Sequence, residues 1–154
     1  MKEIKSVEKE IPVVMKEKHV PSEFFKDREG LFVYSGFEEN IRDKAEPTEA
    51  GKEFKIASFD LAEDANDAEI EEALPKDYLF LETDVCAIIA GLIEKQAKGE
   101  EGTLLNNGYV NLFYTPSRVV YVRWRAGEWL VGAWYRGVSS WYAGYRVFSP
   151  ATGA

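Results

Sequence analysis

The residues best suited to binding chemistry gather in the last third of the chain. Residues 103–154 contain five arginines, a single acidic residue, Glu128, and all four tryptophans. A guanidinium group stacks on aromatic rings and forms paired hydrogen bonds to carboxylate or phosphate. Exposed Tyr and Trp rings stack on bases or pack on apolar protein surface. This combination indicates a binding surface.

Strand alternation sorts these residues into two faces. If residues 118–125 form a strand, Val120 and Val122 share one face, whereas Tyr121 and Arg123 share the other. We expect the valine face to be buried and the tyrosine and arginine face to meet a ligand. A following hairpin would bring further residues close, depending on its register. The candidate binding residues are therefore Tyr121, Arg123, Arg125, Trp129 and Arg136.

The charge distribution supports a competing interpretation. The net charge is −8, and the acidic residues lie almost entirely within residues 1–102. The five arginines would then pair internally with these acids, while the aromatic rings fill the core between sheet and helix. A negative chain also disfavours nucleic acid, because phosphate binding needs clustered Lys and Arg.

Catalytic groups are sparse. His19 is the only histidine, and it precedes Pro21 in a polar segment that gives no sign of holding an imidazole in place. Cys86 is the only cysteine, and it lies on the apolar face of a predicted helix, so we interpret it as a core residue. No local feature supports a Cys86–His19 pair. We predict no catalytic residue and rank an enzyme with an unrecognised pocket last.

Metal and cofactor motifs are equally poor. Acidic residues cluster over residues 60–72, but an alignment with a calcium-binding loop places Ala62 and Ala65 where a ligand and the turn glycine belong. We interpret this cluster as a solvated helix face. Gly51 and Lys52 lack the glycine-rich loop of a phosphate-binding site. We expect no metal and no cofactor.

The pattern of apolar residues predicts one main helix and two shorter ones. Thr83 can cap a helix over about residues 84–98, whose apolar positions follow the spacing of a buried stripe. A short helix is expected over about residues 36–45 and another between the cap Asn66 and Pro75. The stripe consists of Val85, Ile88, Ile89, Leu92 and Ile93.

The remaining runs predict strands. Residues 31–34 and 54–61 are β-prone, and four more runs follow the main helix, with a tight turn at Ala126 and Gly127. Consecutive strands without helices between them predict an antiparallel meander and an α+β fold in one domain, residues 1–154. Residues 1–20 are either an edge strand that contains Pro12 or a flexible arm. The four later runs are residues 109–114, 118–125, 129–135 and 141–148.

These observations lead to a functional hypothesis. The single cysteine, the lack of an apolar leader and the shortness of the longest apolar stretch, residues 85–93, favour a cytoplasmic protein that does not enter a membrane. We expect a non-enzymatic module that binds another protein through its aromatic and arginine-rich sheet. The alternative is binding of single-stranded nucleic acid by the same face. An acidic N-terminal decoy for a basic partner ranks behind both.

Overall fold

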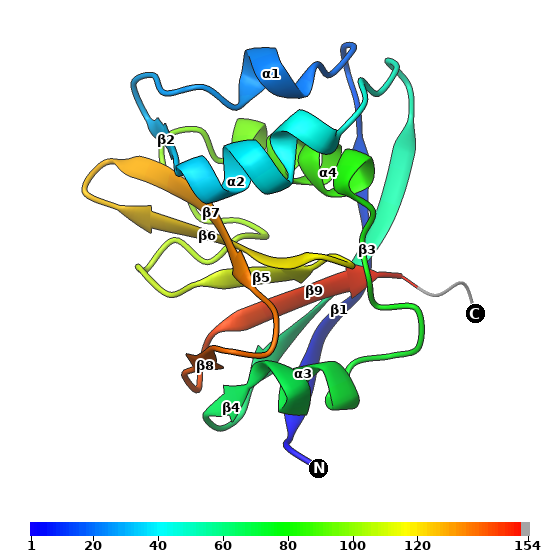
Figure 1. Ribbon diagram of the computed structural model, residues 1–154, viewed down its shortest axis with the longest axis vertical. Coiled ribbons are helices and arrows are strands. Elements are labelled where there is room, and N and C mark those ends of the chain that lie inside the picture. The colour runs from blue at the N-terminus through cyan, green and yellow to red at the C-terminus, as the bar shows by residue number, and fades with distance from the viewer. Residues whose placement is uncertain (152–154) are drawn as a thin grey trace.

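The computed structural model describes residues 1–151 and has an α+β fold with a mostly antiparallel sheet and a few helices (Figure 1). Seven strands form the sheet in the order β1-β3-β9-β5-β6-β7-β2, and β4 pairs with β8 beside it. The strands are β1 (Ile4–Val14), β2 (Leu31–Val33), β3 (Glu53–Leu61), β4 (Ala65–Asn66), β5 (Asn111–Tyr114), β6 (Arg118–Arg125), β7 (Glu128–Tyr135), β8 (Ser140–Trp141) and β9 (Arg146–Pro150). The helices are α1 (Pro21–Phe24), α2 (Ser35–Asn40), the 3-10 helix η1 (Arg42–Lys44), α3 (Asp67–Ala73) and α4 (Glu82–Lys95).

The predicted four-stranded antiparallel meander is wrong beyond its first three strands. β5, β6 and β7 follow one another as expected, but residues 141–148 do not form one strand. The chain turns at Gly144, whose φ of +90° favours glycine, and β9 then inserts between β3 and β5. β9 runs antiparallel to β3 and parallel to β5, and β2 runs parallel to β7. The sheet therefore has seven strands and two parallel pairs.

Burial on both sides explains the central place of β9. Val147 faces one apolar cluster and Phe148 faces the other, and both are fully buried. At the far edge of the sheet, β1 pairs with β3 and with no other strand of the described chain, residues 1–151. It carries Pro12, whose missing N–H an edge strand tolerates.

The main helix, α4, packs its apolar stripe on one side of the sheet. It begins after Leu81 rather than after Thr83, whose hydroxyl instead accepts a hydrogen bond from the backbone N–H of Glu46. Midway along α4, a Cβ on Gly91 would lie 2.7 Å from a methyl group of Val13, so glycine allows β1 to approach the helix closely. Within the described residues, no helix has both the length and the apolar character needed to cross a membrane.

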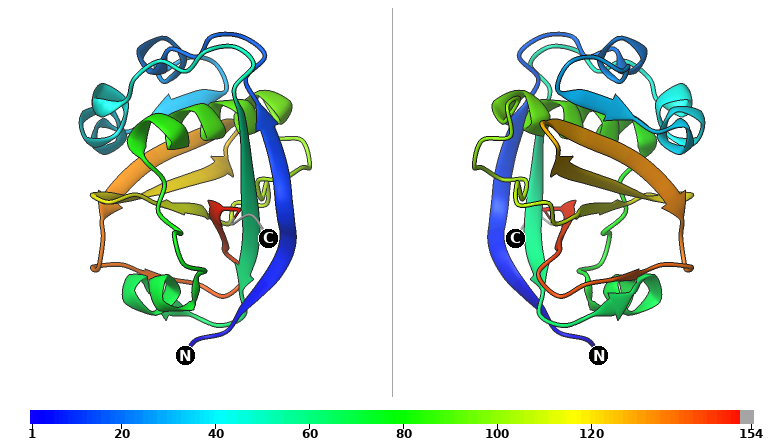
Figure 2. Two further views of the ribbon diagram at one scale, coloured as in Figure 1. Left: turned by 90° about the vertical axis from the view of Figure 1, so that its right-hand side faces the viewer. Right: turned by 90° about the vertical axis from the view of Figure 1, so that its left-hand side faces the viewer.

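Two apolar clusters, one on each side of the sheet, make up the core. Figure 2 shows α1, α2 and α4 at one end of the molecule and α3 at the other, with the sheet between them. On the α4 side, α4 and α2 cover strands that contribute Phe113 and Trp129. On the α3 side, Ile70 of α3 packs toward Leu112 and Tyr114. The predicted cap of α3 is confirmed, because Asn66 and Glu69 form a reciprocal capping box. Each side has its own covering layer, and that of the α3 side is incomplete.

Candidate functional site

Two predicted binding residues, Tyr121 and Arg123, line a small cavity on the α3 side of the sheet. Its volume is about 190 Å³. Both residues come from β6, whereas the opposite wall comes from β8 and from the loop that leads to β9. The other lining residues are Val110, Ser140, Trp141, Tyr142 and Tyr145.

An exposed sheet surface adjoins this cavity. Tyr121 lies opposite Gly132, and Arg123 lies opposite Leu130, so their side chains project on the same side of the sheet. The ring of Tyr34 lies 6.1 Å from that of Tyr121, and Trp134 is 52% exposed. Figure 1 shows α3, β4 and β8 beneath one part of the sheet and no helix beneath β6 and β7. We call this surface the open face; it comprises Phe32, Tyr34, Tyr121, Arg123, Leu130 and Trp134.

The ring of Tyr121 is held in place by a glycine on the neighbouring strand. A Cβ built on Gly132 would lie 2.2 Å from Cζ of Tyr121, so the ring rests directly on the backbone of β7. Burial raises the pKa of the Tyr121 hydroxyl, and the nearby Tyr34 adds to this effect. Tyr121 is therefore a neutral, oriented ring between the cavity and the open face.

The guanidinium of Arg123 has hydrogen-bonding groups without a partner in the described part of the fold. Its Nε is buried and has no hydrogen-bond partner, and within residues 1–151 its side chain forms no ion pair. Arg125, two residues along β6, is exposed and lies opposite Glu128 in the hairpin. Buried polar groups are normally satisfied, so this Nε is unusual, although the Nε of Arg136 is also buried without a partner.

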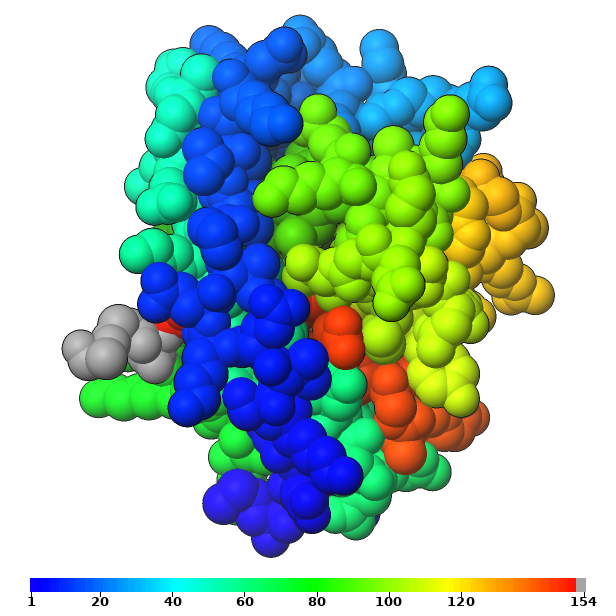
Figure 3. Space-filling view, turned by 180° about the vertical axis from the view of Figure 1, so that it is seen from behind, coloured from blue at the N-terminus to red at the C-terminus, as the bar shows by residue number. Residues whose placement is uncertain are grey.

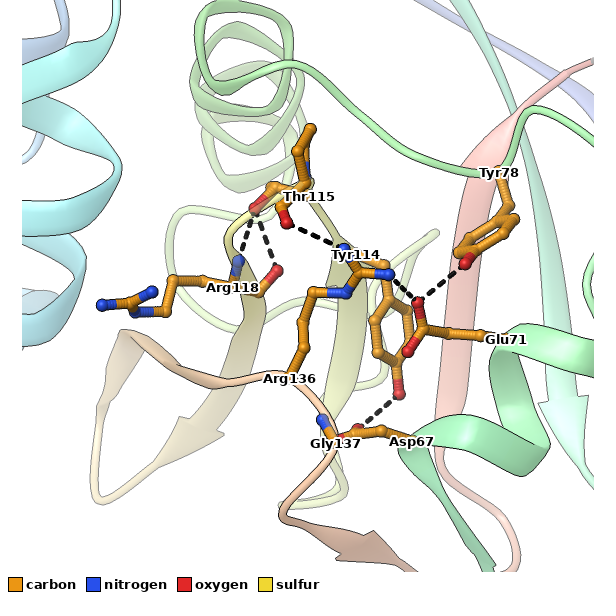
Figure 4. A network of polar contacts seen from close by, with 9 residues as sticks. Asp67, Glu71, Tyr78, Tyr114, Thr115, Arg118, Arg136 and Gly137 are labelled. Carbon is orange, nitrogen blue, oxygen red and sulfur yellow. Dashed lines mark hydrogen bonds and ion pairs between the residues drawn. The ribbon is translucent and has the colours of Figure 1, made fainter.

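Trp129 and Arg136 do not join this cavity. Trp129 is fully buried on the α4 side, where its Nε1 donates a hydrogen bond of 2.7 Å to the carbonyl of Gln96. Arg136 pairs with Glu71 of α3 and donates to the carbonyl of Pro116 at 2.8 Å (Figure 4). Both residues therefore support the fold instead of lining the cavity.

The internal pairing of arginines holds for two of the five. Arg136 binds Glu71, and the Nε of Arg146 lies 2.8 Å from a carboxylate oxygen of Asp60. Arg118 instead lies over the ring of Tyr135, at 4.6 Å from its centroid. Acidic residues from the first two thirds of the chain thus pair with two arginines. Arg123 forms no ion pair within residues 1–151 and lines the cavity.

Asp67 is a structural residue that the sequence did not reveal. It is fully buried and accepts hydrogen bonds of 2.7 Å from the Tyr114 hydroxyl and from Nε1 of Trp141. The backbone N–H groups of Gly137 and Ser139 also donate to it, at 2.9 and 3.3 Å. Part of this network is drawn in Figure 4. Asp67 thereby fixes Trp141, one wall of the cavity, and the solvated helix face expected here is wrong at this position.

The groups considered for catalysis lie elsewhere. Cys86 is fully buried in α4, and burial raises the pKa of its thiol. His19 follows β1 and is buried as well. In the described part of the chain, no three His, Cys, Asp or Glu side chains are placed to hold a metal ion.

The chain matches no protein-family model, no curated protein and no solved structure, so its function is inferred from the cavity and the open face alone.

Proposed function

We propose that this protein is a non-enzymatic binding module that recognises another protein through the open face. The cavity at Tyr121 and Arg123 receives one acidic side chain of the partner. The observation that carries this proposal is the position of Arg123, which lines a cavity walled by Trp141, Tyr142 and Tyr145 and forms no ion pair within residues 1–151.

The size and lining of the cavity support a single side chain as its occupant. A volume of about 190 Å³ is below the roughly 300–1,000 Å³ of pockets that enclose whole small molecules. The aromatic walls offer apolar contact to the carbon chain of Asp or Glu. The guanidinium of Arg123 offers a charge-assisted hydrogen bond to the carboxylate, stronger than a bond between neutral groups.

The surroundings of the cavity favour a protein partner. Trp134 and Tyr142 are more than half exposed, and Tyr34 is partly exposed beside them. Residues that dominate binding energy at protein interfaces are enriched in Trp, Tyr and Arg. The exposed rings therefore supply apolar contact area around the charged anchor.

Single-stranded nucleic acid is the second candidate, because the same rings offer stacking platforms beside an arginine. The open face itself has one arginine, Arg123, with Arg125 next to it on β6. Phosphate binding relies on several cations, and the chain as a whole has a net charge of −8. This charge ranks nucleic acid behind a protein partner.

The test is selection of peptides from a random library displayed on phage, with the full chain as bait. We expect the selected peptides to share Asp or Glu and to bind the double variant Arg123→Ala/Arg125→Ala at least tenfold more weakly, a loss of about 1.4 kcal/mol. Lys9→Ala, which removes one exposed charge from β1, is the control and should leave affinity within about twofold.

Urea unfolding of the same preparations separates binding from folding. Lower stability of the double variant with unchanged peptide affinity in the folded fraction would refute the assignment of this face. The second candidate is tested with an oligonucleotide of deoxythymidine, whose binding is measured by fluorescence anisotropy at low and high salt. Oligonucleotide binding that weakens steeply with salt and needs Arg123, without peptide binding, would support the second candidate instead.

A further inference from the structure

A second and larger cavity lies between the end of β1, α1 and the C-terminal half of α4. Its volume is about 580 Å³, within the range of pockets that hold small molecules. Figure 3 shows the surface hollowed between the blue end of β1 and the green end of α4. Val14, Val20 and Phe24 give it apolar walls, and Gly91 on α4 leaves the wall there without a side chain. None of these residues belongs to the open face.

The cavity is cationic in an otherwise acidic protein. Five basic side chains line it, against the three acidic residues Glu17, Glu23 and Glu94. None of these eight side chains forms an ion pair with another residue of the described chain, 1–151. The chain as a whole has a net charge of −8, so this local excess of positive charge would attract an anion. The basic residues are Lys16, Lys18, Lys26, Arg28 and Lys95.

His19 adds a buried polar group to the lining. The residue is only 6% exposed, and its Nε2 has no hydrogen-bond partner. Its position is nevertheless fixed, because its backbone N–H and C=O pair with Thr48 at 2.8 and 2.9 Å. The rings of Phe24 and Phe25 lie edge-on to the imidazole, with centroids 5.8 and 5.9 Å away.

An unpaired polar nitrogen in this environment has a free-energy cost that a ligand would relieve. A buried group without a partner loses its hydrogen bonds to water and gains none in return. Burial also lowers the pKa of His19 to about 4, so near neutral pH the ring is uncharged. An uncharged imidazole serves as a hydrogen-bond donor or acceptor, while the lysines supply the charge.

We propose that this cavity binds a small organic anion that carries phosphate or carboxylate groups. Lys16, Lys18 and Lys95 neutralise its charge. A small rotation of the His19 side chain, whose Nε2 has no exposed surface in the free protein, brings its imidazole into hydrogen-bond distance of the anion. Phe24 and the valines contact its carbon skeleton, which an inorganic ion lacks. The proposal is independent of the open face and of its protein partner.

The test measures thermal unfolding and calorimetric binding of the full chain with four probes at about 0.15 M salt. The probes are pyrophosphate, citrate, adenosine monophosphate and uncharged adenosine. We expect at least one organic anion, citrate or adenosine monophosphate, to bind with a Kd below about 1 mM and raise the Tm. Adenosine should do neither. Comparison of citrate with adenosine monophosphate identifies the anionic group that the site prefers.

Two lysine-pair variants with equal loss of charge assign the site. Lys16→Ala/Lys95→Ala should weaken anion binding at least tenfold, whereas Lys5→Ala/Lys9→Ala on β1 should leave it unchanged. His19→Gln should also weaken anion binding, whereas Arg123→Ala should leave anion binding unchanged. The proposal is overturned if no organic anion binds, or if both lysine pairs weaken binding equally, since the latter result indicates only a general response to net charge.

Discussion

Charged residues in this protein have roles that depend on their immediate partners. Asp67 receives two side-chain and two backbone hydrogen bonds in the interior, so it organises the connection between β7 and β9. Arg136 binds Glu71, which also accepts from the Tyr78 hydroxyl at 2.7 Å. Arg123 has the same side-chain chemistry as Arg136, but within residues 1–151 it has no such acceptor. This difference separates an arginine that supports the fold from the one to which we assign a role in binding.

A comparison of two arginine truncations tests that difference. Arg136→Ala removes the partner of a mostly buried Glu71 and should lower the free energy of unfolding by about 1–3 kcal/mol. Arg125→Ala removes an exposed side chain and should change it by less than about 0.5 kcal/mol. Urea unfolding measures both. Equal effects would contradict the structural role assigned to Arg136.

His19 makes stability depend on pH. Its pKa is about 4 in the folded protein, through burial, against an ordinary value near 6.5 in the unfolded chain. The unfolded state therefore takes up a proton first, and stability falls as pH drops from about 6.5 to about 4. The gap between the two pKa values corresponds to about 3 kcal/mol.

The control for this prediction is His19→Gln, which lacks the titrating ring. Carboxylates also protonate in this pH range, so the relevant quantity is the difference between the two unfolding curves. That difference should be constant above about pH 6.5 and should change through the acid range. A difference that does not vary with pH would show that His19 is solvated in the folded state.

At the scale of elements, α4 anchors the larger core. Ile89 is fully buried in the stripe that packs on the sheet, so Ile89→Ala should cost about 2–5 kcal/mol through lost burial and a residual cavity. Leu81, just before the helix, is 62% exposed, and Leu81→Ala should cost little. Denaturant unfolding measures both variants. A loss of unfolding free energy below about 0.5 kcal/mol in Ile89→Ala would contradict this packing.

A second prediction at this scale concerns the contact between Gly132 of β7 and the Tyr121 ring of β6. Gly132→Ala should cost about 1–3 kcal/mol, because the new methyl group overlaps the Tyr121 ring. In a Tyr121→Ala background the same change should cost nothing, since the ring is gone and alanine restricts the unfolded chain more than glycine. Four unfolding curves form the double-mutant cycle. Additive effects would mean that the ring does not rest on Gly132.

The whole molecule is a sheet with α4 and α2 on one side and the smaller α3 on the other (Figure 1). Its only cysteine is fully buried, and within residues 1–151 no side-chain cluster is arranged for a metal ion. We therefore predict that chelation followed by addition of calcium or zinc leaves the Tm unchanged. A rise of several degrees would contradict this, because a ligand that binds only the native state must stabilise it.

Much of the local structure was predictable because it depends on neighbouring residues. The apolar stripe of α4, the capping box of Asn66 and Glu69, and the β6–β7 hairpin are all encoded within a few positions. At the turn, Ala126 and Gly127 both have positive φ, as a tight hairpin requires. Strand alternation likewise placed Tyr121 and Arg123 on one side of β6.

What the sequence alone determined is therefore the main helix, the cap of α3, the β6–β7 hairpin and the sidedness of β6, because side-chain period and turn chemistry are local properties. It did not predict α1, β4 or the break between β8 and β9. Only the tertiary structure decided that β9 inserts between β3 and β5, since pairing partners distant in sequence leave no local signature. The same holds for the arginines. Whether Glu71 or Asp60 lies within reach of a guanidinium depends on how α3 and β3 pack, and that packing pairs Arg136 and Arg146 while leaving Arg123 to the cavity.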